Sequence, residues 1–227
     1  MVLPPTTLTA PAPVPLRRLV FSAQIDATAG FSSRVHGVGN GENGAPMEST
    51  GSHDVGDVII TADIMQALPD GSLVIVIAET GKRVASSARC GVLNDAVVMV
   101  PSSSPEPTPE ERGLLMLLAR GLAAGHDLAT GNAWALEDRT AAQSTIGVRV
   151  GAVNAQTASL DLSGTVTGKT GNDSNEHFRA SVEYDPDRTV PVSATLDSDT
   201  HIDGGDHYSE IALHAVYKLV SDSLPRS

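Results

Sequence analysis

Apolar and polar residues alternate over much of this sequence, with the period of two that is typical of β-strands. In residues 57–65 every second position is valine, isoleucine or alanine, and in residues 72–80 leucine and isoleucine recur at the same interval. Pro69, Asp70 and Gly71 separate the two segments, and this combination favours a tight turn. The pattern therefore predicts an antiparallel β-hairpin over residues 57–80.

The last third of the chain repeats this alternation in successive segments. It predicts strands over residues 145–153, 157–169, 179–185, 190–202 and 209–221. Short connections rich in glycine, asparagine and aspartate join these segments, so consecutive strands are expected to be antiparallel neighbours. We predict an antiparallel meander over residues 145–221. Similar patterns predict one strand within residues 17–35 and another at residues 97–100.

Residues 109–124 show a different spacing, that of an amphipathic α-helix. Thr108 is suited to the N-cap position and Pro109 to the first helical position, and Glu111 completes a capping box with Thr108. Gly125 favours an end to the helix. The apolar stripe of this helix consists of Leu114, Leu115, Leu117, Leu118 and Leu122. The sequence therefore predicts one helix that packs on a sheet.

These elements predict a mainly β (α+β) fold of about 8–10 strands. Strands with one apolar and one polar face bury only one side. The sheet is therefore expected to curve into a half-barrel with the helix across its concave side, or to form an open sandwich. The half-barrel is similar to that of bacterial periplasmic lipoprotein carriers, whose curved sheet holds a lipid under helices. This resemblance concerns the architecture alone and transfers no functional residue.

Residues 1–16 form an extended, proline-rich tail that precedes the single predicted domain, residues 17–227. Five of the 14 prolines lie in this tail, which favours a polyproline-like conformation. Proline interrupts every apolar stretch, so the tail is not a signal peptide; it resembles the segment that follows one after cleavage. We therefore expect a secreted or periplasmic protein. Within the domain, residues 37–56 are rich in glycine, asparagine and serine and predict a loop.

The charge and composition narrow the range of functions. With 15 basic and 27 acidic residues the net charge is −12, and aromatic residues make up only 3%. Nucleic-acid binding needs clustered basic residues or aromatic stacking platforms, so it is excluded. No apolar run is long enough to span a bilayer, so we do not expect an integral membrane protein. Cys90 is the single cysteine, so the fold contains no internal disulfide.

One acidic segment is a weak candidate for binding a divalent cation. In the predicted strand 190–202, alternate positions place several possible ligands on one face, and carboxylate oxygens are the ligands that hard cations prefer. The candidate ligands are Asp197, Asp199, His201 and Asp203. The sequence contains neither a Gly-x-Ser-x-Gly motif nor a His-Glu-x-x-His motif, so we predict a non-enzymatic protein without a cofactor.

The first functional hypothesis is a carrier that binds an apolar small molecule or lipid in a cleft between helix and sheet. The residues expected to line this cleft are Leu114, Leu115, Leu118 and Leu122. The alternative is a structural subunit that forms homo-oligomers when its tail adds to the sheet edge of another copy. Candidate contacts in the tail are Leu3, Leu8, Val14 and Leu16. A remote alternative is a metal-dependent hydrolase that uses the acidic segment.

Overall fold

The computed structural model describes residues 14–33, 50–81, 88–93, 98–99, 104–119, 122–123, 125–138, 142–168, 173–204 and 207–224. Within these residues the chain forms one antiparallel sheet of eleven strands and one helix, α1 (Pro109–Leu117). The strands are β1 (Arg17–Ser33), β2 (Thr50–Ala67), β3 (Leu73–Gly81), β4 (Arg89–Leu93), β5 (Val98–Met99), β6 (Ala133–Asp138), β7 (Ala142–Val153), β8 (Ala158–Gly168), β9 (Asp173–Asp185), β10 (Val190–Asp203) and β11 (His207–Asp222). The prediction of a mainly β fold with one helix is confirmed.

The sheet is open, and its strand order is β5-β4-β3-β2-β1-β11-β10-β9-β8-β7-β6. Adjacent strands are consecutive in the chain everywhere except at β1 and β11, which join the two halves of the sheet. The predicted hairpin is the β2–β3 pair, and the predicted meander corresponds to β7–β11. Both predictions are confirmed.

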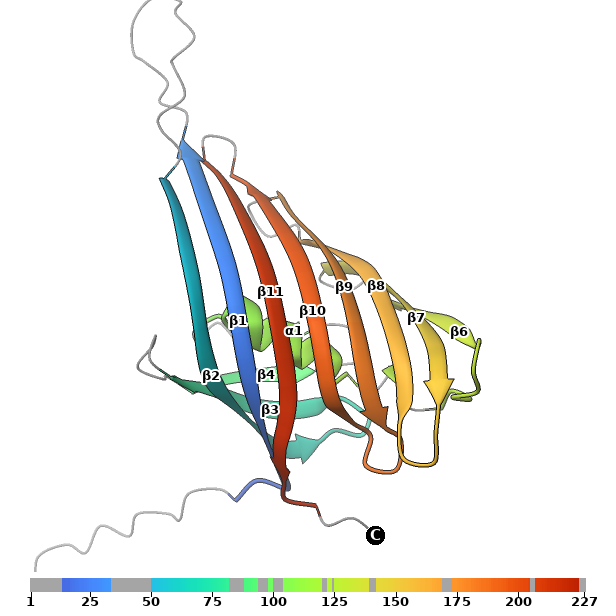
Figure 1. Ribbon diagram of the computed structural model, residues 1–227. Coiled ribbons are helices and arrows are strands. Elements are labelled where there is room, and N and C mark those ends of the chain that lie inside the picture. Colours follow the sequence, from blue (N-terminus) through green and yellow to red (C-terminus); the bar gives the residue numbers. More distant parts are fainter. Residues whose placement is uncertain are drawn as a thin grey trace, which may run out of the picture.

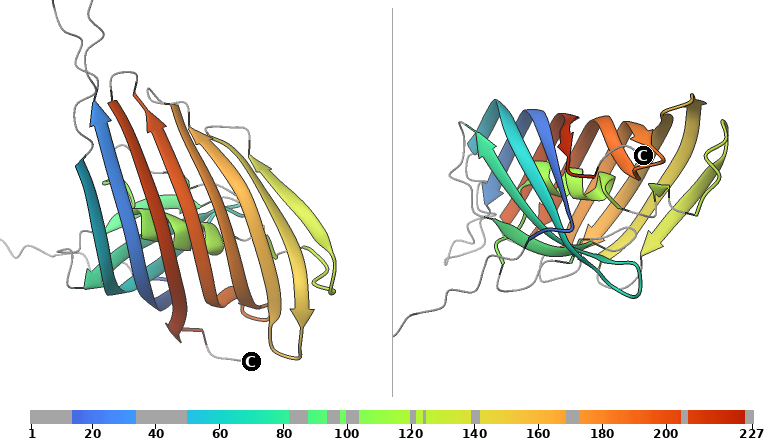
Figure 2. Two further views of the ribbon diagram at one scale, coloured as in Figure 1. Left: turned by 45° about the horizontal axis from the view of Figure 1, so that its top comes forward. Right: turned by 90° about the horizontal axis from the view of Figure 1, so that it is seen from below.

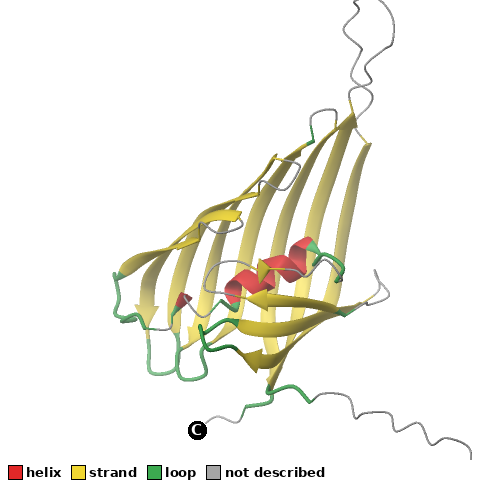
Figure 3. Cartoon of the chain, turned by 180° about the vertical axis from the view of Figure 1, so that it is seen from behind, coloured by secondary structure: helices red, strands yellow, loops and turns green. Residues whose placement is uncertain are grey.

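The sheet curves around the helix (Figures 1 and 2). Strands β1, β2 and β7–β11 form a tall curved wall, and β3 and β4 cross below α1. Seen from behind in Figure 3, the helix lies against the inner face of this wall. The helix contacts β11 on one side and β3 and β5 on the other, so the curved sheet and the helix share one core.

The core contains the inward-facing residues of the strands and the buried side of the helix. Large side chains that are almost completely buried include Leu19, Phe21, Ile25, Ile60, Leu114 and Tyr217. Gly113 lies where the helix approaches β10 and β11 most closely. A methyl group at this position would overlap the side chain of Leu196 and lie 2.9 Å from the hydroxyl oxygen of Tyr217. The absence of a side chain at Gly113 therefore permits this close packing.

The helix begins where the sequence predicts and ends earlier. The Thr108 hydroxyl accepts a hydrogen bond from the Glu111 amide, and the Glu111 carboxylate accepts one from the Thr108 amide, so the capping box is confirmed. The last helical residue is Leu117, not residue 124. Leu122 is still completely buried, although it lies beyond α1 in a 3₁₀ conformation. Its helical spacing reflects continued packing into the core, which is why the predicted end is wrong.

The predicted boundary of the glycine-rich loop is also wrong in part. Residues 50–56 belong to β2 and pair with β1 in register, for example Thr50 with Phe31 and Asp54 with Ala27. The length of β1 supplies backbone partners for this polar segment, and that pairing outweighs its low strand propensity. The rest of the predicted loop, residues 37–49, lies outside the described residues.

Only the end of the predicted tail belongs to the described part of the chain. Val14 and Leu16 are exposed, and the Leu16 amide donates a hydrogen bond of 2.9 Å to the Ile64 carbonyl oxygen, which extends the β1–β2 pairing. Leu3 and Leu8 lie outside the described residues.

Candidate functional site

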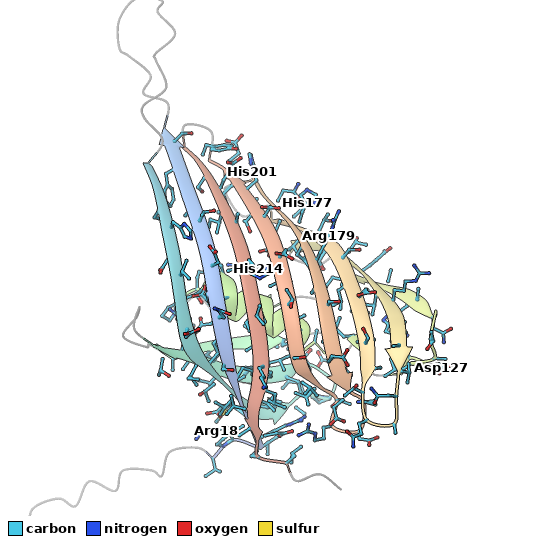
Figure 4. All side chains as sticks on the ribbon, viewed as in Figure 1. Arg18, Asp127, His177, Arg179, His201 and His214 are labelled. Atoms are coloured by element: carbon cyan, nitrogen blue, oxygen red, sulfur yellow. The ribbon has the colours of Figure 1, made fainter. Side chains whose placement is uncertain are left out.

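The face of the sheet that points away from α1 is polar, and we call it the outer face. Figure 4 shows His177, Arg179, His201 and His214 on this face. It carries the alternate residues of each strand that do not enter the core. Those used below are Asp26, His53, Arg149, Asp161, Ser163, His177, Arg179, Asp197, Asp199, His201, Glu210, His214 and Lys218.

A groove of about 640 Å³ crosses the outer face over β6–β10. We call it the outer-face groove and define it by Ala133, Gly147, Arg149, Asp161, Ser163 and Arg179. The strand register places Gly147, Ser163 and Arg179 in one row across β7, β8 and β9. Ala133, Arg149 and Asp161 form the next row. Small residues thus lie between two long arginines, which leaves the space between them open.

The two arginines of the groove lack a partner within the described part of the chain. This part contains seven arginines, and five form ion pairs with carboxylates: Arg17–Asp222, Arg18–Asp63, Arg89–Glu111, Arg112–Glu106 and Arg188–Asp185. Arg149 and Arg179 form neither an ion pair nor a side-chain hydrogen bond with a described residue. Both guanidinium groups therefore present their N–H donors to solvent.

The nearest carboxylates in the groove have other partners. Asp161 is opposite Arg149 in the register, yet it accepts a hydrogen bond of 2.9 Å from the Ser181 hydroxyl. Asp197 is opposite Arg179, yet its Oδ1 lies 2.6 Å from Nδ1 of His214. The groove therefore contains two arginines without an acidic partner among the described residues and two carboxylates that are already hydrogen-bonded.

Histidines and carboxylates alternate across the outer face beside the groove. Nε2 of His53 on β2 lies 2.9 Å from Oδ1 of Asp26 on β1. Asp26 is opposite His214 on β11, which is paired with Asp197 on β10. Asp197 in turn is opposite Arg179 on β9. From β2 to β9, five adjacent strands thus carry histidine, aspartate, histidine, aspartate and arginine in turn. The last two, Asp197 and Arg179, line the outer-face groove.

The candidate metal ligands share one face, as predicted, but they do not converge. Asp197, Asp199, His201 and Asp203 lie at alternate positions of β10 on the outer face. Alternate residues of a strand are about 7 Å apart, whereas the ligands of one calcium ion lie within about 2.6 Å of it. Among the described residues, no three histidine, cysteine, aspartate or glutamate side chains are arranged to hold a metal ion.

The leucines predicted to line an apolar cleft belong to the core. Leu114, Leu115 and Leu122 are at most 2% exposed, and Leu118 packs partly buried against the same core. Leu115 borders a space of about 10 Å³, no larger than a single water molecule needs. The two grooves of ligand size lie on the outer face, on the other side of the sheet.

A second groove of about 730 Å³ lies higher on the outer face, over β1, β2 and β9–β11. Its lining includes His53, His177, His201 and Glu210. None of the described residues that line it is an arginine, and Nδ1 of His201 lies 3.9 Å from a carboxylate oxygen of Glu210. Among the described residues, the arginines without an ion pair therefore belong to the first groove.

A buried acidic cluster joins the helix to the edge of the sheet. Glu79 of β3 is 1% exposed and lies close to Glu110 and Glu111. Burial and the negative charges of these two glutamates raise the pKa of Glu79 to about 7. Nη1 of Arg89 lies 2.8 Å from Oε1 of Glu111, yet burial still raises the pKa of Glu111. The cluster has one arginine for three carboxyl groups.

Neither the groove nor the acidic cluster was predicted from the sequence. Arg149 and Arg179 lie in polar positions of their predicted strands, and only the register of β7–β10 shows which partners they lack. Glu79 has a detectable signal: it continues the inward series of Leu73, Ile75 and Ile77 at period two. A carboxyl group at such a position indicates a buried polar contact.

Comparison of the sequence with protein-family models gives no match, and comparison with curated proteins gives none either. None of the described residues forms a helix long and apolar enough to cross a membrane. The function is therefore inferred from the geometry and chemistry of this chain.

Proposed function

We propose that this protein is a non-catalytic binding protein that holds a small, hydroxyl-rich molecule carrying a carboxylate or phosphate group in the outer-face groove. The observation that carries the proposal is the pair Arg149 and Arg179. They are the two arginines without an acidic partner in the described part of the chain, and both line the same groove. They stand out because the protein has a net charge of −12.

Guanidinium groups suit this ligand because their N–H donors match the geometry of carboxylate and phosphate oxygens. The volume of the groove falls within the usual range for small-molecule sites, about 300–1,000 Å³. The hydroxyl groups of Ser163 and Thr195 and the carboxylate of Asp161 provide further partners. These groups suit the hydroxyl groups of a sugar-like molecule.

The chemistry of the lining favours binding over catalysis. No histidine is among the described residues that line the groove, so none of these residues offers its serines an imidazole base. Ser181 donates its hydrogen bond to Asp161. The proposal retains the predicted non-enzymatic binding role but places a polar ligand on the outer face, away from the helix. Export and self-assembly through the tail stay predictions from the sequence.

Isothermal titration calorimetry with glucuronate, glucose 6-phosphate and glucose tests the proposal. The two anionic sugars are expected to bind and neutral glucose to bind far more weakly. Arg149→Gln and Arg179→Gln should each weaken anion binding about tenfold or more, because hydrogen bonds to charged groups contribute about 1.5–3 kcal/mol. The matched control is Lys218→Gln, which removes one positive charge from the outer face outside the groove.

The two arginine variants and the lysine variant have the same net charge. A loss of affinity confined to the arginine variants supports a site with defined contacts. Equal losses in all three variants, or no binding of either anionic sugar, would contradict the proposal.

A further inference from the structure

We propose that protonation of His214 strengthens anion binding in the outer-face groove, so that the protein binds its ligand more tightly in acidic surroundings. This inference rests on the proposed function and adds its regulation. The residue that regulates binding is then His214 on β11, which lies next to the groove but does not line it.

The geometry links His214 to the groove through one carboxylate. Asp197 lines the groove and lies on β10 between His214 on β11 and Arg179 on β9. Its Oδ1 is 2.6 Å from Nδ1 of His214. Arg179 faces Asp197 across the strands without forming an ion pair with it. Asp197 therefore contacts His214 and also places its negative charge beside the proposed anion site.

The charge of Asp197 acts differently in the two states of His214. Beside a neutral imidazole, the carboxylate adds an uncompensated negative charge to the groove and repels an incoming anion. Beside an imidazolium, the two charges form an ion pair and the repulsion is largely removed. Histidine is the side chain whose charge commonly changes between about pH 5 and pH 8. The groove therefore becomes more positive as the pH falls through this range.

Other charged groups also face His214, and they define the controls. Asp26 of β1 is opposite His214 and is paired with His53. Asp199 borders the same small hollow as His214, and His177 of β9 is opposite Asp199. His177 lies two residues from Arg179 on the same face, so its own protonation must be separated from that of His214.

The size of the effect is limited by solvent. The side chains of His214 and Asp197 are 51% and 67% exposed, so water and salt screen their charges. We expect the dissociation constant of glucuronate to be about three to ten times lower at about pH 5.5 than at about pH 8, at constant ionic strength. The carboxylate of glucuronate stays ionised throughout this range, so the ligand itself does not titrate.

Substitution of either member of the His214–Asp197 pair is expected to remove the pH dependence. One substitution leaves the affinity at its weak level and the other at its tight level. His214→Gln should bind glucuronate at both pH values as weakly as the wild type does at high pH. Asp197→Asn should bind at both pH values about as tightly as the wild type does at low pH. His177→Gln is the control and should retain the wild-type ratio. Circular dichroism of each variant verifies that the exposed substitution leaves the fold intact.

The outcomes separate this inference from the proposed function. Binding of equal strength at both pH values would overturn the control by His214 while the binding function stands. A wild-type ratio in His214→Gln, or its loss in His177→Gln, would assign the effect to another group and also overturn the inference. Failure of the wild type to bind either glucuronate or glucose 6-phosphate at both pH values would overturn both proposals.

Discussion

The hydroxyl group of Tyr217 on β11 donates a hydrogen bond of 2.8 Å to the main-chain carbonyl oxygen of Glu110, in the first turn of α1. Tyr217 is 1% exposed, so this bond lies in the core between helix and sheet. Burial and the negative charges of Glu110, Glu79 and Glu176 raise the pKa of Tyr217 well above its ordinary value. The hydroxyl group therefore stays protonated, and remains a donor, at a pH equal to the ordinary pKa of a tyrosine.

Tyr217→Phe is expected to lower the free energy of unfolding by about 1–1.5 kcal/mol, because it removes a buried hydrogen bond but keeps the aromatic ring. Urea denaturation followed by circular dichroism measures the change. Tyr208→Phe is the control, since the hydroxyl group of Tyr208 donates its hydrogen bond to the exposed carboxylate of Glu210. A similar loss in both variants would show that the Tyr217 bond does not fix the helix to the sheet.

Gly113→Ala is expected to destabilise the protein by about 1–2 kcal/mol. Alanine favours a helix over glycine by about 1 kcal/mol, but overpacking a core costs about 1–3 kcal/mol, and an overlap as close as this one belongs in the upper part of that range. Here the added methyl group overlaps Leu196 and crowds the Tyr217 hydroxyl. Gly51→Ala is the control, because the nearest atom to its new methyl group would be the Ala29 carbonyl oxygen at 3.8 Å. An unchanged or higher melting temperature for Gly113→Ala would contradict the packing described for α1.

Glu79 makes stability depend on pH in a defined direction. Its pKa is raised from 4.5 to about 7 in the folded protein, so the folded state binds a proton that the unfolded state releases between these values. The resulting stabilisation is complete below about pH 4.5 and is lost as the pH rises through about 7. We expect the loss to amount to about 1–3 kcal/mol.

Glu79→Gln should remove most of this dependence, and its stability relative to the wild type should increase from about pH 5 to about pH 8. Chemical denaturation at both pH values measures the difference. Glu183→Gln, which changes an exposed carboxylate on β9, serves as the control. If Glu79→Gln and the wild type lose equal stability over this range, the buried cluster is not its source.

Asp222 has the opposite pH dependence. Burial alone would raise the pKa of Asp222, but hydrogen bonds from Arg17 and the Leu224 amide and the charges of Arg17 and Arg188 hold it below its ordinary value. Nε and Nη2 of Arg17 donate hydrogen bonds of 3.0 and 2.7 Å to its two carboxylate oxygens. This stabilisation is present above the ordinary pKa and is lost as the pH falls through the folded-state pKa.

Asp222→Asn is therefore expected to cost about 1–3 kcal/mol at neutral pH, with a smaller difference from the wild type below about pH 3. Thermal unfolding at both pH values measures it. Asp187→Asn, in the nearby β9–β10 turn, is the exposed control. A cost that does not change with pH would mean that the charge of Asp222 contributes little to stability.

The sequence predicts elements well where the pattern reflects burial on one face. Strands β8, β10 and β11 have clean alternation and were predicted within two residues at each end. The start of β9 was predicted at residue 179, but the strand begins at Asp173, because its polar first residues pair with β8 and β10. The five-residue strand β4 was missed because Arg89, Cys90 and Gly91 interrupt its pattern. Arg89 occupies an inward position because Glu111 pairs with it there, and that partner comes from the helix. Such contacts between distant segments leave no local periodicity in the sequence.

Even less of the candidate site than of the fold could be predicted from the local sequence pattern. Alternation correctly placed Asp197 and His201 on one face of one strand, but it contains no information about neighbouring strands. The site depends on β7–β11 lying side by side in a particular register, which brings Asp197 into contact with His214 and leaves Arg179 without an ion pair among the described residues. Sequence periodicity gives the face of a residue, whereas its partners depend on topology.

The pairing of β1 with β11 has a consequence for synthesis of the protein on the ribosome. Every other strand pair in the sheet forms between consecutive strands and can assemble as the chain emerges. Until residues 207–222 have been made, however, β1 and β10 each present an unpaired edge, 17 and 14 residues long. Long unpaired edges recruit other strands and promote aggregation. The nascent chain is therefore vulnerable until β11 has emerged, and insertion of β11 removes both edges in a single step.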